Sequence, residues 1–171
     1  MTPSIDLRLA TIIRAMRDVV SPAIDRDNSL AQEQAALVIG HLQLLAVQWS
    51  RTNEYANVCL TDLAGALRAL SPEGGPQTMH AATALFAALD CTAGAREARY
   101  KAVMAGADQL IRAADVDGGE EFGKQLRQAM LAFSKRQSLR DRSWFALSGF
   151  DLRPGELLSI ESLAGGELHD G

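Results

Sequence analysis

The sequence predicts an all-α protein, an up-and-down helical bundle with four main helices, a long central helix hairpin and a short C-terminal helix or tail. Apolar residues make up 47% of the 171 residues and aromatic residues only 5%. This composition suits helix packing better than a β-sandwich, which needs more β-branched and aromatic side chains. Apolar side chains also recur in steps of four and three along most of the chain, which is the spacing of one helix face.

The first helix is expected over residues 3–21. Pro3 is tolerated in a first helical turn, and Ser21-Pro22 ends the helix because the residue before proline is pushed out of the α region. The apolar stripe of this helix consists of Ile5, Leu9, Ile12, Met16 and Val19.

The second helix is expected over residues 28–70, with Asp27 or Asn28 as its N-cap. No proline interrupts this range. Its stripe keeps the four-three alternation throughout: Val38, Leu42, Leu45, Trp49, Thr52, Ala56, Cys59, Leu63, Ala66 and Leu70.

The third and fourth helices are expected over residues 77–115 and 119–141. The segment from Ser71 to Pro76 predicts a stop and turn before the third helix, and Asp117-Gly118-Gly119 predicts the next break. The fourth helix begins with acidic and ends with basic side chains, the order that the helix dipole favours.

The whole chain, residues 1–171, is expected to form one domain. Its core spans residues 3–142, and the tail over residues 143–171 packs onto the bundle. The aromatic side chains expected to make this contact are Trp144, Phe145 and Phe150, and a short helix is expected near residues 156–164.

The unequal helix lengths predict self-association. The flanking helices can cover the central hairpin near residues 30–50 and 100–115, which leaves an alanine-rich end near 52–95 uncovered. Either the tail or a second copy in a homodimer can cover that end. The alternative is that both long helices bend, near residues 50–53 and 90–94, where helix propensity is weak.

Several functional classes are disfavoured by composition and motifs. The formal net charge of −4 argues against nucleic-acid binding, and no apolar run is long enough for a transmembrane helix. No glutamate has a histidine three positions later, so a di-iron site of the bundle type is not expected, and we predict neither metal nor cofactor. We expect a cytoplasmic protein of bacterial type.

Two weak sites can still be named. On the second helix, a polar line of side chains seven positions apart could border a small-ligand pocket, with aromatic rings nearby. Its members are Gln34, His41 and Gln48, together with Trp49 and Tyr55. On the fourth helix, an anion could bind to a basic group that includes Arg127, Arg136 and Arg140.

The alternative interpretation without a binding site is that both groups are solvated helix faces. The polar line could also be a flank that faces a partner subunit. The sequence therefore favours a self-associating interaction or structural protein over an enzyme, and docking on an enzyme or regulator fits such a protein. The alternative is a small-ligand binding protein or enzyme with a pocket between helices near His41.

Overall fold

The computed structural model describes residues 3–148 and 151–164 of the chain. Within these ranges the regular elements are helices, and a single antiparallel bridge joins Gly74 to Gly118. The predicted all-α class is confirmed.

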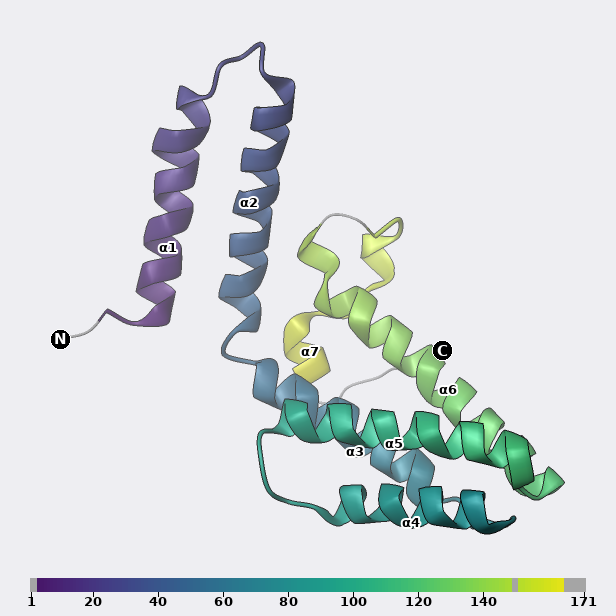
Figure 1. Ribbon diagram of the computed structural model, residues 1–171. Coiled ribbons are helices and arrows are strands. Elements are labelled where there is room, and N and C mark those ends of the chain that lie inside the picture. Colours follow the sequence, from purple (N-terminus) through teal and green to yellow (C-terminus); the bar gives the residue numbers. More distant parts are fainter. Residues whose placement is uncertain (1–2, 149–150, 165–171) are drawn as a thin grey trace. The chain divides into compact units, whose positions relative to one another are not determined.

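The described residues contain seven α-helices, which Figure 1 shows in chain order. They are α1 (Ile5–Ala15), α2 (Ser29–Gln48), α3 (Thr52–Arg68), α4 (Pro76–Asp90), α5 (Arg96–Asp117), α6 (Glu120–Trp144) and α7 (Ile160–Ala164). A π-helical turn, η1 (Met16–Val20), and a 3-10 turn, η2 (Ser21–Ala23), follow α1, and further 3-10 turns are η3 (Ala146–Ser148) and η4 (Pro154–Glu156).

The two long helices expected over 28–70 and 77–115 are each broken into two. The chain turns between Gln48 and Thr52, and again between Asp90 and Arg96, so the bent alternative is the one that the structure adopts. At the first break the Thr52 hydroxyl donates to the Gln48 carbonyl at 3.1 Å. Thr11 and Thr83 make the same bond inside the continuous helices α1 and α4, so this bond alone does not account for a break that carries neither glycine nor proline. At the second, Gly94 has a φ of 88°, a left-handed conformation that favours glycine.

The described chain forms two compact units, and each is treated by itself. The hairpin unit contains residues 3–52 with 141–148 and 151–160, and the core unit contains residues 53–140 with 161–164. Helix α6 runs from the core unit into the hairpin unit.

The apolar core of the core unit is built by α3, α4, α5 and α6. Its members are Leu60, Leu63, Leu67, Ala82, Leu85, Leu89, Val103, Ala107, Leu110, Phe122, Leu126 and Phe133. Half of this cluster comes from the stretch 52–95, so the expectation that this end is uncovered is wrong. Because the long helices break, their alanine-rich parts pack around each other and against the large side chains of α6.

Two of the core unit's connectors, the one between α3 and α4 and the one between α5 and α6, meet at Asp117, the last residue of α5. Its carboxylate accepts hydrogen bonds from the backbone N–H groups of Gln77 and Thr78 at 2.8 and 2.9 Å and from the Thr78 hydroxyl at 2.6 Å. The hydrogen bond from the Thr78 hydroxyl is the main cause that lowers the pKa of Asp117, and the two N–H groups lower it further. Helix α4 has no side-chain N-cap of its own, so the last residue of α5 supplies that cap.

Candidate functional site

Helices α1 and α2 form an antiparallel hairpin, visible as the purple and blue pair in Figure 1. The Ser4 hydroxyl caps α1 by accepting from the Leu7 N–H at 3.2 Å, and the Asn28 side chain caps α2 by accepting from the Ala31 N–H at 3.1 Å. These caps fix where both helices begin. At the open end of the hairpin, the indole N–H of Trp49 donates to the Asp6 carboxylate at 2.9 Å and joins the two helices.

The contact between α1 and α2 buries few side chains. Leu9 and Ala35 are buried, whereas Met16 and Leu42 are only partly so. Most helical stability in proteins comes from packing an apolar face, since isolated helices of this length are marginal in water. The hairpin therefore has less internal support than the core unit.

A row of large apolar side chains remains exposed on each helix of the hairpin. The exposed fractions are 48% for Ile5 and 46% for Ile12 on α1, and 44% for Val38 and 47% for Leu45 on α2. Within each helix the two residues are seven positions apart and so lie in line along one face. We call these four residues the apolar face.

Both rows lie on the same side of the hairpin. Ile12 comes three positions after the inward-facing Leu9, and Val38 comes three after the inward-facing Ala35. Three residues fall about 60° short of a full helical turn, so both side chains are displaced from the helix contact in the same rotational sense. Because the helices run antiparallel, this sense brings both rows to one side.

The other side of α2 is contacted by the segment that follows α6. Leu44, nine positions from Ala35 and so on the opposite face of α2, is buried. The turn η3 contacts α2, and the Gln48 amide donates to the Trp144 carbonyl at 2.7 Å. Trp144 is buried as expected for the tail, whereas Phe145 is exposed and Phe150 lies outside the described residues.

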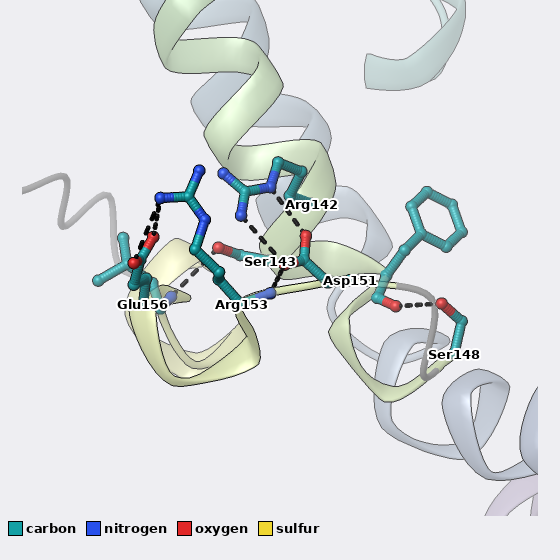
Figure 2. A network of polar contacts seen from close by, with 8 residues as sticks. Arg142, Ser143, Ser148, Asp151, Arg153 and Glu156 are labelled. Carbon is teal, nitrogen blue, oxygen red and sulfur yellow. Dashed lines mark hydrogen bonds and ion pairs between the residues drawn. The ribbon is translucent and has the colours of Figure 1, made fainter.

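A polar network holds this tail segment (Figure 2). The Arg142 guanidinium makes two hydrogen bonds to the Asp151 carboxylate, at 2.8 and 3.0 Å, and the Arg153 N–H donates to the same carboxylate. The Arg142 guanidinium, ahead of the Arg153 N–H, lowers the pKa of Asp151 to about 2. The Ser143 hydroxyl accepts from the Leu158 N–H at 3.1 Å. The chain is therefore held against the end of α6 at two points, Asp151 and Leu158.

The predicted polar line does not converge on one place. Gln34 and His41 are exposed on α2, at the edge of the apolar face, and Gln48 and Trp49 make the contacts to Trp144 and Asp6 given above. Tyr55 belongs to the core unit, where its hydroxyl accepts a hydrogen bond from the Gln137 amide at 3.3 Å.

The predicted basic group is engaged by carboxylates of the core unit. Arg127 pairs with Asp115 at 3.2 Å, while Arg136 and Arg140 both pair with Asp62, at 2.7 and 2.6 Å. Burial raises the pKa of Asp62, but hydrogen bonds from the two guanidinium groups outweigh it and the net pKa is lowered. Sequence reasoning singled out the arginines and missed Asp62, although it lies one position before Leu63 on a helix with few charges.

Two shallow hollows lie on the described surface, and one of them borders the apolar face at Ile12. One of about 190 Å³ is lined by Asn53, Glu54, Asn57, Val58 and Arg96, and one of about 310 Å³ by Pro3, Leu7, Arg8, Thr11 and Ile12. Pockets for small ligands usually enclose roughly 300–1,000 Å³ and bury most of the ligand. Neither hollow contains a residue of the predicted polar line.

In the described part of the chain, no group of three or more His, Cys, Asp and Glu side chains gathers in a way that could hold a metal ion. No helix there combines the length and the apolar character needed to cross a bilayer.

Comparison of the chain with protein families, with curated proteins and with solved structures gave no match. The apolar face is therefore the feature of the described residues that bears most directly on function.

Proposed function

We propose that this chain is an interaction protein whose α1–α2 hairpin is the docking element for a helical partner. The observation that carries the proposal is the apolar face, with four large side chains each nearly half exposed on one side of a hairpin. Contiguous apolar patches on monomeric proteins commonly mark interaction sites.

The spacing within the apolar face favours helices as the partner. Apolar side chains that repeat every seven residues on antiparallel helices are the pattern of four-helix bundles, in which each stripe packs against two neighbours. On α1, Leu9 and Met16 lie toward α2, whereas Ile5 and Ile12 of the same stripe are exposed. In a four-helix bundle, these two exposed residues would pack against another helix. A helix, or a pair of helices, has the shape that completes this arrangement.

The alternative of a small-ligand protein has less support. The exposed residues Gln34 and His41 border the apolar face, and neither lines the two hollows described above. Polar residues around an apolar centre are the usual composition of a protein–protein interface.

Site-specific photocrosslinking in cells that make the protein tests this function. A benzophenone amino acid is placed at Ile12 or Leu45, and at Leu131, which is 59% exposed on α6, as the matched control. We expect protein adducts from positions 12 and 45 that are lost when Val38→Lys is added, and far fewer from position 131. The proposal fails if positions 12 and 45 give no adduct, or give the same adducts as position 131.

A further inference from the structure

We infer that the partner seated on the apolar face is a second copy of this chain, docked through the same face of its own α1–α2 hairpin. Two hairpins then form one four-helix bundle with two-fold symmetry. This inference builds on the proposed function and names the occupant of its docking site.

The apolar surface of one hairpin has the area that a dimer interface needs. Val19, which is 67% exposed, comes seven positions after Ile12 and prolongs the α1 row into the π-helical turn. Together with the apolar face it leaves on the order of 500 Å² of apolar surface exposed. A standard interface buries about 800 Å² on each partner, of which roughly 60% is apolar, or about 500 Å². One hairpin therefore offers the apolar area that one side of a stable dimer needs.

The low charge of the apolar face also favours a second copy as the partner. A two-fold interface brings the same surface patch together on both copies, so any strongly charged patch would face its own sign. Among the described residues of α1 and α2, Arg8 is the charged side chain at the edge of the apolar face. The acidic side chains Asp6, Asp18 and Glu33 fall on other sides of their helices by helical position. A nearly uncharged face is complementary to itself.

The hairpin also buries too few apolar side chains to be stable by itself, and a second copy would add to them. With Leu9 and Ala35 as the buried residues of the contact between α1 and α2, the hairpin needs a further layer to reach the packing of an ordinary bundle. A second copy is present wherever the first is made. In the dimer, Gln34 and His41 lie at the polar rim, which gives the predicted polar line a place at a subunit interface.

The test measures association of the purified full-length protein by sedimentation velocity and light scattering over a range of concentrations. The wild type is expected to be a dimer at tens of micromolar. The double variant Ile12→Glu/Leu45→Glu is expected to raise Kd at least about 100-fold, because four glutamates then meet in each dimer interface. The single variants Leu7→Glu and Leu131→Glu, both at positions 59% exposed, are expected to change Kd less than about threefold.

A charge-swap experiment separates lost docking from lost folding. The double variant Ile12→Lys/Leu45→Lys is expected to be monomeric alone, as is Ile12→Glu/Leu45→Glu. Mixed together, the two are expected to form a one-to-one heterodimer, because opposite charges now meet across the interface. Circular dichroism of each variant monitors its helix content.

A wild type that stays monomeric at about 100 µM, a face variant that dimerises like the wild type, or a mixture that stays monomeric would each overturn the inference. These failures differ from failure of the proposed function. If the pure protein is monomeric while positions 12 and 45 crosslink a different protein in cells, the docking function stands and the second copy is excluded as its partner. If there are no adducts either, both fail.

Discussion

The Asp62 carboxylate pairs with two arginines of α6, Arg136 and Arg140. Arg140 is only 2% exposed, and among the described residues its Nε has no hydrogen-bond partner, while its other guanidinium nitrogens reach Asp62 and Gln137. Removing one partner of a buried ion pair costs several kcal/mol because the other charge stays buried. The Asp62 side chain is 20% exposed, so water partly compensates the loss and the expected cost is smaller than for a fully buried pair. Asp62→Asn is expected to lower the free energy of unfolding by about 2–3 kcal/mol in urea titrations.

The matched control is Asp90→Asn, which removes the exposed ion pair with Arg68. It is expected to cost less than about 1 kcal/mol. An equal loss of stability in both variants would contradict the importance given to Asp62.

The pH dependence of stability gives a second test of the Asp62 ion pairs. Because the folded state lowers the pKa of Asp62, the unfolded state binds the proton first, and this stabilisation is present above the ordinary value near 3.8 and lost as the pH falls through the lowered pKa. Below about pH 4 the difference between wild type and Asp62→Asn should therefore shrink.

At the scale of the elements, the sequence predicts helix faces better than helix ends. Strong signals such as Ser71–Pro76 and Asp117-Gly118-Gly119 mark real breaks between α3 and α4 and between α5 and α6. The break before Thr52 carries no glycine or proline, so it depends on a weak local preference that tertiary packing decides. The cap that Asp117 provides to α4 was equally hard to foresee, because donor and acceptor are 39 residues apart.

Two glycines in the core unit differ in the space around them and allow a direct test of the tie between the connectors. At Gly74, which has a φ of 157°, an added Cβ would lie 2.7 Å from the Gly118 Cα and 2.8 Å from the Asp117 carbonyl oxygen. Gly74→Ala is therefore expected to lower the free energy of unfolding by about 1–3 kcal/mol. At Gly65, within α3, a Cβ meets nothing within 4 Å, so Gly65→Ala should raise it by about 0.5–1 kcal/mol. Thermal and urea unfolding measure both, and a stabilising Gly74→Ala would show that the connectors can separate freely.

At the scale of the whole molecule, a stripe in the sequence identifies apolar residues without saying which neighbour each one meets. Ile5, Leu9, Ile12 and Met16 form one stripe, yet Leu9 is buried while Ile5 and Ile12 are about half exposed. The same limit explains why self-association was expected at residues 52–95, which supply half of the core cluster. The residues of the apolar face were all visible as apolar in the sequence. Their exposure became apparent only once the long helices were seen to break and α2 was assigned to a different unit from α5.

The two units are expected to differ in local stability, and self-association should reduce the difference. Local opening is easiest where few apolar contacts are buried. We expect native-state hydrogen exchange to show weaker protection for the amides of α1 and α2 than for those of α3–α6, which share the core cluster. Raising the total protein concentration to about 100 times the dimer Kd leaves roughly 7% of the chains monomeric, which should stabilise the hairpin helices by about 1.6 kcal/mol and slow their exchange. The reason is that a second copy binds only the folded hairpin.

The Ile12→Glu/Leu45→Glu protein serves as the control, since its α1 and α2 amides should exchange at the same rate at every concentration. Uniform protection of α1–α6 in dilute wild-type protein would contradict this expectation, because the hairpin would then open only when the core unit unfolds. Concentration-dependent protection confined to α3–α6 would place the association surface on the core unit instead. Because the amides of each helix are followed separately, the experiment tests both where the chain is least stable by itself and which face a second copy covers.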